Sequence, residues 1–241
     1  MTPDQHRYFL EDVDSTSEEI RRRLRAGHPE DARLLVWTTR QTAGHGQRGR
    51  TWESPPGNLA ASWWLPALPR HGWITPWAGL AVLEASSCLG LHLRDIGLKW
   101  VNDLVHVAET GQARKWGGIL AEAPTSSGIL LGIGLNLVPA ALPEATWVGA
   151  FSPITPAPED WIDALDRALG APASPSAIRS AYVRACRSLG REALWQGADG
   201  TSERGVVSGL SEDGGVILVT PDGRRLTLRS GRLRGPTGRY M

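Results

Sequence analysis

Apolar residues recur at helical spacing in four segments of the chain, whereas the other apolar runs have the length of strands. Ser15 stands three residues before Glu18, the spacing of a capping box, and predicts an amphipathic helix that ends near Gly27. A longer helix is predicted from Pro76 to about Leu93. Two further helices are predicted from the apolar sets Trp161, Ile162, Leu165, Leu169 and Ile178, Tyr182, Val183, Cys186, Leu189.

Short apolar runs bounded by turn residues predict the strands of a sheet. They cover residues 34–38, 58–65, 97–101, 104–107, 114–122 and 129–137. The last two are joined by Thr125-Ser126-Ser127-Gly128 and form a predicted antiparallel hairpin, whereas Asn102-Asp103 forms a predicted turn. We therefore expect an α+β fold, with a mixed or antiparallel sheet and packed helices, in a domain of residues 1–189.

After Gly190 the pattern changes to short strands alone, which are separated by turns rich in glycine and proline. The predicted strands cover residues 193–195, 205–210, 216–220 and 224–228. Strands of this length with frequent turns are typical of a small β barrel. We expect residues 190–241 to form such a barrel as a second domain.

The composition indicates a folded protein without a general attraction for polyanions. Hydrophobic residues make up 41% of the chain, charged residues 21%, and the formal net charge is +1. Neither nucleic acid nor a membrane is therefore an expected partner. The first residues do not resemble a secretion signal and no apolar run approaches about 18 residues, so we expect a cytoplasmic protein. Cys88 and Cys186 lie on apolar faces of predicted helices, and we expect both in the core.

A glycine-rich loop at residues 44–49 matches the spacing of the dinucleotide-binding motif. That motif requires a helix after its last glycine, whereas Ser54-Pro55-Pro56-Gly57 follows here, and no carboxylate stands about 20 positions further on. We therefore exclude an NAD site. The loop still permits backbone amides to approach an anion, with Arg48 and Arg50 adding charge and Trp52 offering a stacking surface. The alternative is a solvated hairpin loop with Trp52 against the core.

Two lysines lie in segments that are otherwise apolar. Lys99 stands in the predicted strand 97–101, and Lys115 is at the start of the predicted strand 114–122. Removing an ammonium group from water is costly, so each lysine is ion-paired, exposed at a strand end, or part of a site. Asn102-Asp103 follows Lys99 and a Gly-Gly pair follows Lys115, and this combination favours a phosphate site.

Several motifs follow one another along the chain. They are Asp14-Ser15-Thr16, Gln41-Thr42-Ala43-Gly44 with the loop to Trp52, Ser54 to Leu59, Lys99-Trp100 with Asn102-Asp103-Leu104, Lys115 to Glu122, and Gly132 to Asn136. In this order they resemble biotin protein ligases, within the wider group of biotin and lipoate ligases, over nearly the whole chain. The resemblance implies a mixed sheet with packed helices followed by an SH3-like barrel, in agreement with the predicted elements.

The resemblance also implies an activity and a set of site residues. ATP and biotin would form biotinyl-5′-adenylate with release of pyrophosphate, and a lysine of the biotin carboxyl carrier domain of a carboxylase would then attack it. Lys115 is the implied catalytic residue, which bridges the biotin carboxylate and the α-phosphate. The implied biotin contacts are Ser15, Thr16, Gln41, Gly44, His45, Gly118 and Ile119. The implied contacts to ATP or the adenylate are Gln47, Arg48, Arg50, Trp52, Lys99, Asn102, Asp103 and Asn136, with Asp103 also binding Mg²⁺.

The chain departs from the family pattern at several positions. His45 and Gln47 stand where relatives have arginine, which predicts weaker retention of the adenylate. Val101 replaces a proline and Ser17 an asparagine. Many relatives carry an N-terminal DNA-binding domain, but only 13 residues precede Asp14, so we expect no repressor activity. We expect a monomer or a homodimer.

Three alternatives account for part of this pattern. Helix capping alone would explain Ser15 and Thr16. A ligase for another carboxylic acid, such as lipoate or octanoate, would share the adenylation residues, but these linear acids have no ureido group to meet Ser15 and Gln41. A biotin or nucleotide sensor without turnover is compatible with the altered loop, although the presence of Lys115 and Asn102-Asp103 argues against it.

Overall fold

A computed structural model describes residues 5–68, 72–139, 142–170, 174–237 and 240 of the chain. Within these residues seven strands form the larger of two sheets: β1 (Gln5–Phe9), β2 (Arg33–Thr38), β3 (Leu59–Pro66), β4 (Ile96–Lys99), β5 (Asp103–Val107), β6 (Ala113–Glu122) and β7 (Gly128–Leu135). Their order in space is β1-β2-β3-β7-β6-β5-β4. The sheet is mixed, because β1 and β2 are parallel while the other neighbours are antiparallel.

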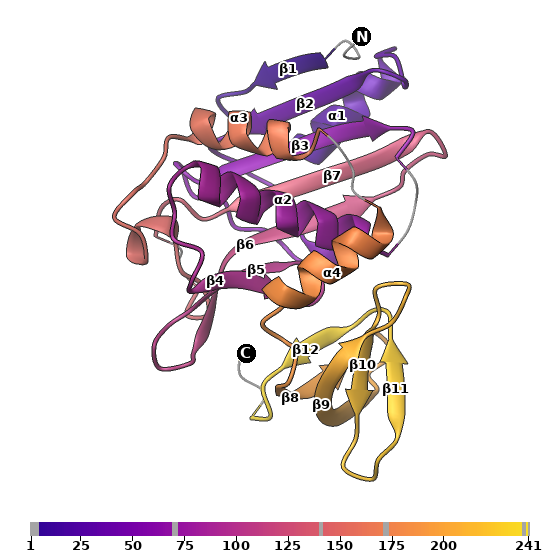
Figure 1. Cartoon of the computed structure of the whole chain (residues 1–241). Helices are drawn as coiled ribbons and strands as arrows, with labels where there is room; N and C mark the ends of the chain where they lie inside the picture. Colours follow the sequence, from indigo (N-terminus) through magenta and orange to yellow (C-terminus); the bar gives the residue numbers. More distant parts are fainter. Residues whose placement is uncertain (1–4, 69–71, 140–141, 171–173, 238–239, 241) are drawn as a thin grey trace.

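Helices cover both faces of this sheet (Figure 1). They are α1 (Thr16–Arg25), α2 (Ile74–Cys88), α3 (Pro158–Ala168) and α4 (Pro175–Ala185). Side chains alternate between the faces of a strand, so Trp64 packs with Ile20 of α1 while Trp63 belongs to the core on the side of α2. The α+β class predicted from the sequence is confirmed. None of the helices in the described ranges combines the length and apolar character that a membrane crossing needs.

A second sheet follows α4 and lies beside one end of the larger one (Figure 1). Its strands are β8 (Glu192–Gln196), β9 (Ser202–Leu210), β10 (Val216–Val219), β11 (Arg225–Leu228) and β12 (Arg232–Arg234), in the spatial order β11-β10-β9-β8-β12. The pairs are antiparallel, in keeping with an SH3-like barrel. The indoles of Trp73 and Trp100 donate to the carbonyls of Glu212 and Gly214 at 2.6 and 3.0 Å, which fixes the smaller sheet against the larger.

Three features differ from the sequence-based expectation. Strands β1 and β12 were not expected, because one is an edge strand of mostly polar residues and the other has a single inward apolar residue, Leu233. Helix α2 ends at Cys88, since Gly90 adopts a positive φ of 84°. The expectation that both cysteines are buried is wrong for Cys88, which is exposed at the helix end; Cys186 is buried.

Candidate active site

A cavity of about 300 Å³ lies on the face of the larger sheet that carries α1. Nearly all of the site residues predicted from the sequence line it. These are Ser15, Thr16, Gln41, His45, Gln47, Arg48, Arg50, Trp52, Lys99, Asn102, Asp103, Lys115, Gly118, Ile119 and Asn136. Of the predicted set, Gly44 does not line the cavity.

A row of residues that pair with one another across five neighbouring strands, which we call the register line, crosses the floor of this cavity. Ala60 of β3 pairs with Gly134 of β7, Gly134 with Gly118 of β6, Gly118 with Asp103 of β5, and Asp103 with Lys99 of β4. Four strand spacings make this line about 19 Å long. Two glycines in its middle leave the backbone uncovered, so an extended ligand can lie flat against the sheet.

Hydroxyl and amide groups gather at the β3 end of the line. The side-chain oxygen of Gln41 accepts from the backbone N–H and the hydroxyl of Thr16, at 2.8 and 3.1 Å. The hydroxyl of Ser62 lies 2.8 Å from that of Thr16 and 2.9 Å from that of Ser17. Ser15 caps α1 by accepting from the backbone N–H of Glu18, as predicted. The sequence analysis missed Ser62, whose only signal is a hydroxyl within an apolar strand.

Trp52 lies over the two glycines at the centre of the line. A Cβ at Gly134 would come within 2.5 Å of the Trp52 ring, and one at Gly118 within 3.2 Å. The ammonium group of Lys115 lies 5.3 Å from the centroid of the same ring. The Trp52 ring therefore occupies the space that side chains at Gly118 and Gly134 would fill. It forms a wall of the cavity and is not part of the core.

Replacing Gly134 by alanine is expected to lower the free energy of unfolding by about 2 kcal/mol, because the added methyl group overlaps the Trp52 ring. Gly132→Ala is the matched control: it lies on the same strand and face, and its Cβ would meet nothing closer than 3.5 Å. Urea unfolding of both variants measures the difference. Equal stabilities would show that Trp52 does not occupy this position.

Charged groups gather at the β4 end of the line. Asp103 accepts from Lys115 at 2.5 Å through Oδ1 and lies 3.4 Å from Lys99 through Oδ2. The phenol of Tyr240 also donates to Oδ2, at 2.9 Å, and its ring lies 4.5 Å from the ammonium group of Lys99. Lys99 is buried, at 4% exposed, so the expectation of an exposed strand end does not hold for it. Lys115 is 23% exposed towards the cavity.

These contacts determine the charge of Asp103. Burial alone would raise the pKa of its carboxyl group, but the charges of Lys115 and Lys99 outweigh burial and hold the pKa well below its usual value. Burial lowers the pKa of Lys99, against the opposing charge of Asp103. Burial, with the nearby charge of Asp103, raises the pKa of Tyr240 well above its usual value. Asp103 is therefore an anion that holds two cations, and Tyr240 is a protonated donor.

The glycine-rich loop closes over the cavity as a small hairpin. His45 pairs with Thr51, and the N–H of Trp52 donates to the carbonyl of Gly44 at 2.9 Å. A side chain at Gly44 would come within 2.7 Å of both Gln41 and Trp52, which explains a glycine that does not line the cavity. Arg48 and Arg50 make no ion pair within the described ranges. Both are exposed and also line the cavity, so the loop is a solvated hairpin whose arginines lie at the cavity mouth.

The smaller sheet contributes a part of the cavity that the sequence analysis missed. Arg232 and Arg234 of β12 line it, and Arg234 pairs with Glu144 at 2.8 Å. Burial lowers the pKa of the Arg232 guanidinium, with the nearby charges of Arg50 and Arg234 acting in the same direction. Arginines from the loop and from β12 thus face one another across the two sheets. No sequence signal marks β12, because three residues are too few for a pattern.

The two predicted asparagines use their amides to hold the backbone. Asn102 donates to the carbonyl of Ile119 at 3.1 Å, and Asn136 donates to that of Thr146 at 3.0 Å. Each carbonyl belongs to a segment beside the cavity. Their contribution to the site is structural, because Asn102 holds the backbone of β6 at Ile119 and Asn136 holds the segment at Thr146.

The described residues do not offer a site for a resident metal ion. No group of three or more histidine, cysteine, aspartate or glutamate side chains is close enough together, within those residues, to hold one. Both oxygens of Asp103 are already occupied by lysine and tyrosine donors. The donor set therefore does not fit Mg²⁺ bound by the protein alone.

Known proteins resemble the chain in both sequence and structure. A biotin--[acetyl-CoA-carboxylase] ligase of Paracoccus denitrificans is 29% identical over 248 residues, which cover 90% of this chain and 96% of that protein. A mutant biotin protein ligase from Aquifex aeolicus in complex with biotin is 25% identical, with a TM-score of 0.75, covering 95% of this chain and 98% of that one. Leishmania major biotin protein ligase in complex with biotinyl-5-AMP is 25% identical, with a TM-score of 0.65, covering 92% and 98%.

A family model gives the same result over the part of the chain that builds the cavity floor. Residues 10–136 match the model of the biotin/lipoate A/B protein ligase family. This range includes α1, the glycine-rich loop and the strands that carry Lys99, Asp103 and Lys115. The match spans more than half of the sequence, and the chain therefore belongs to the biotin/lipoate A/B protein ligase family.

Proposed function

We propose that the protein is an adenylate-forming ligase that joins biotin to a lysine of a biotin carboxyl carrier domain. The observation that carries this proposal is the register line across the sheet. It runs from Ala60 of β3, beside the neutral hydrogen-bonding groups, over the bare glycines to Asp103 and Lys99, and the side chain of Lys115 reaches Asp103. A neutral polar head, an apolar body and a carboxylate next to a polyphosphate fit this sequence of environments. The ligase names of the relatives, with biotin and biotinyl-5-AMP in their complexes, support it.

Biotin would lie at the β3 end of the cavity. Its ureido group has one carbonyl and two N–H groups, and these match the hydroxyls of Thr16 and Ser62 and the amide of Gln41. The fused rings and the acyl chain would lie along Gly134 and Gly118 beneath the Trp52 ring. The carboxylate then reaches Lys115. Ser15, His45 and Ile119 would complete the walls of this pocket.

ATP would lie at the β4 end. Arg48 and Arg50 from the loop and Arg232 from β12 supply charge for its phosphates, and Lys99 lies at the edge of the same region. Trp52 offers an aromatic surface, and Gln47, Asn102 and Asn136 supply polar groups on the walls. Arg232 compensates for the charge that the loop lacks at His45 and Gln47.

The first reaction joins two anions, and the charge of Lys115 makes this possible. A carboxylate oxygen of biotin attacks the α-phosphorus, the bond to the leaving pyrophosphate breaks, and biotinyl-5′-adenylate forms. The ammonium group of Lys115 neutralises both reactants and the charge that develops on the phosphoryl oxygens. Asp103 keeps that group in position before the reactants arrive. Mg²⁺ would be held mainly by the phosphates of ATP, because the described residues contain no cluster of three His, Cys, Asp or Glu side chains.

The second reaction transfers the acyl group. The amine of a carrier lysine attacks the carbonyl carbon of the mixed anhydride, AMP leaves with the electrons of the broken bond, and the amine loses a proton. The carrier is expected to be the biotin carboxyl carrier domain of a carboxylase, in line with the carboxylase ligase relative. The cytoplasmic location and a monomeric or homodimeric state stay predictions.

The alternative acids are less well matched by the cavity. Lipoate and octanoate have no ureido group to bond with Thr16, Gln41 and Ser62, so this polar cluster would add nothing to their binding. A sensor without turnover would not require a lysine placed between the two halves of the cavity.

Exchange of labelled pyrophosphate into ATP tests the proposal. We expect exchange with biotin and none with lipoate or octanoate, followed by transfer of biotin to an apo carrier domain. Exchange with lipoate or octanoate alone would establish the other ligase. Binding of biotin without exchange would establish the sensor.

A further inference from the structure

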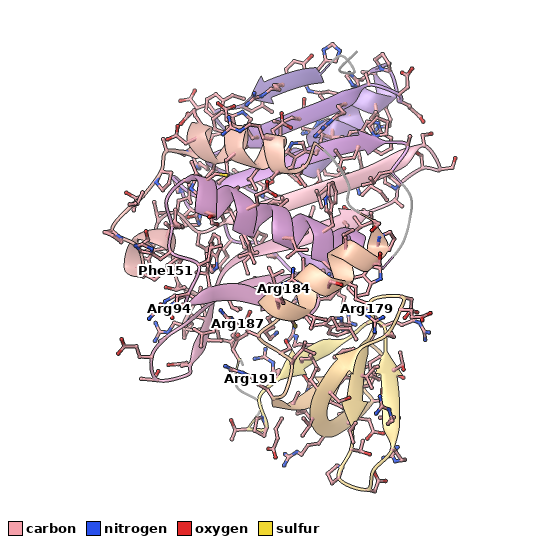
Figure 2. All side chains as sticks on the ribbon, viewed as in Figure 1. Arg94, Phe151, Arg179, Arg184, Arg187 and Arg191 are labelled. Carbon is pink, nitrogen blue, oxygen red and sulfur yellow. The ribbon has the colours of Figure 1, made fainter. Side chains whose placement is uncertain are left out.

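The chain contains only two lysines, although lysine and arginine together number 26. Both lysines, Lys99 and Lys115, line the cavity. Every other basic side chain, apart from histidine, is an arginine, including those labelled around α4 and the smaller sheet in Figure 2, such as Arg184 and Arg191. The primary amines of the side chains are thus confined to the candidate active site.

This distribution matters because of the proposed product, and the inference rests on the proposed function. A biotinyl-adenylate is a mixed anhydride that acylates amines. A guanidinium group stays protonated at neutral pH and is not a nucleophile, whereas a lysine amine reacts whenever it loses its proton. The arginine surface therefore offers no acceptor to an adenylate that leaves the site. The two lysine amines of the chain are instead the ones nearest to the adenylate.

The contacts of the two lysines keep them from reacting. Asp103 pairs with the ammonium groups of both, at 2.5 Å for Lys115 and 3.4 Å for Lys99. Each ion pair directs the amine towards the carboxylate of Asp103 and away from an approaching carbonyl carbon. The ring of Tyr240 covers the Lys99 ammonium group at 4.5 Å, and the Tyr240 phenol holds Asp103 in place at 2.9 Å. Lys99 has 4% of its side chain exposed.

We infer that Asp103 and Tyr240 protect the two lysines of the active site from acylation by the adenylate formed beside them. The reaction they prevent would join a neutral lysine Nζ to the biotinyl carbonyl carbon, release AMP from that carbon, and pass one amine proton to solvent. The product would be an amide that has lost the positive charge on which adenylation depends. Tyr240 acts by covering the Lys99 ammonium group with its ring.

Lys99 is the lysine that most needs this protection. Burial lowers the pKa of its amine, so more of it would be neutral if it came into contact with a reagent. Coverage by the Tyr240 ring prevents that contact. Lys115 has no such cover and must face the reactants, so its protection depends on Asp103 alone.

Acetylation of the full-length protein with an amine-reactive ester tests the inference without any enzymatic turnover. Peptide mass spectrometry gives the rate at each lysine, and two lysines make the result unambiguous. In the folded wild type, Lys99 should react about 10²-fold more slowly than in the urea-unfolded chain. Tyr240→Ala should raise the Lys99 rate about tenfold and leave Lys115 unchanged. Asp103→Asn should raise both rates, because neither amine is then held by an ion pair.

Two control variants separate protection from a general loosening of the fold. Tyr240→Phe keeps the ring and should leave Lys99 protected. Tyr8→Ala removes a tyrosine ring that lies 3.7 Å from the Arg23 guanidinium, far along the sheet, and should change neither rate. Equal Lys99 rates in wild type and Tyr240→Ala would overturn the inference. So would a folded wild-type Lys99 that reacts as fast as the unfolded one, and this measurement needs no variant.

Turnover provides the second test. Wild-type protein that exchanges pyrophosphate with biotin should show no biotin on Lys99 or Lys115 after prolonged incubation with ATP and biotin. Biotin on either lysine would overturn the protection while leaving the proposed ligase intact. Absence of any exchange would instead contradict the proposed function, and the acetylation rates would still decide whether Asp103 and Tyr240 shield the two amines.

Discussion

Replacing Lys115 by glutamine is expected to reduce the rate of biotin-dependent pyrophosphate exchange by about 10²–10³-fold. The substitution keeps a hydrogen-bond donor of similar length but removes the charge that neutralises a carboxylate and a phosphate at their point of contact. A charge of this kind acts mainly in the transition state, so kcat should fall far more than the affinity for biotin. Initial rates at saturating ATP, with biotin binding measured by calorimetry, separate the two effects.

Arg114→Gln is the control for Lys115→Gln. Arg114 is the preceding residue of β6, is exposed, and does not line the cavity, so removing its charge should leave the exchange rate within about twofold of wild type. Similar losses in both variants would mean that the charge of β6 as a whole matters. An unaffected Lys115→Gln would remove the central residue of the proposed mechanism.

Asp103→Asn is expected to lower the free energy of unfolding by about 3 kcal/mol at pH 7. The asparagine has the same shape, but the ammonium groups of Lys99 and Lys115 lose the anion between them. Burial of Lys99 makes this costly, because water does not replace the lost partner. Urea unfolding of wild type and variant measures the loss.

The size of this loss should depend on pH. The pKa of Asp103 is lower in the folded protein than the 3.8 of an unperturbed carboxyl group. Its ionised form therefore stabilises the fold fully above that value, and the contribution is lost as the pH falls through the folded pKa. The difference between wild type and Asp103→Asn should be constant from about pH 5 to pH 7 and shrink below about pH 4.

Asp163→Asn serves as the comparison for Asp103→Asn. Asp163 is the partner of Arg7 in an ion pair where both side chains are well exposed, so its loss should cost less than about 1 kcal/mol. If the two asparagine variants were equally stable, the Asp103 pair would behave as a surface pair. A loss at Asp103 that did not change with pH would show that shape rather than charge is responsible.

Most of the larger sheet and its helices could be predicted because each element has its own pattern. The hairpin of β6 and β7 has two long apolar strands with a polar turn, and the capping serine marks the start of α1. The error at Cys88 came from extending the helical pattern beyond the point where the backbone turns at Gly90. Apolar spacing continues through such a turn, so it does not locate the end of a helix.

The part of the candidate site on the larger sheet could be predicted, but the part that the C-terminal segment contributes could not. Lys99, Asp103 and Lys115 stand next to turns and glycines in the sequence, and these neighbours indicate a site. Arg232 also follows a glycine, Gly231, but it and Tyr240 lie in the segment of the smaller sheet, far along the chain from the other site residues. They reach the cavity only because the smaller sheet is fixed to the larger one by Trp73 and Trp100. Contacts of this kind depend on the relative position of two sheets, which no local pattern encodes.

The position of Tyr240 has a practical consequence for anyone who produces this protein. Its ring lies on Lys99 and its phenol on Asp103, so a peptide fused close behind Tyr240 would begin beside the charged end of the cavity. A purification tag at that end would compete with the carrier domain for access. Recombinant protein for kinetic work should therefore carry its affinity handle at the opposite terminus, beside the edge strand β1, or have a C-terminal one removed without residual residues.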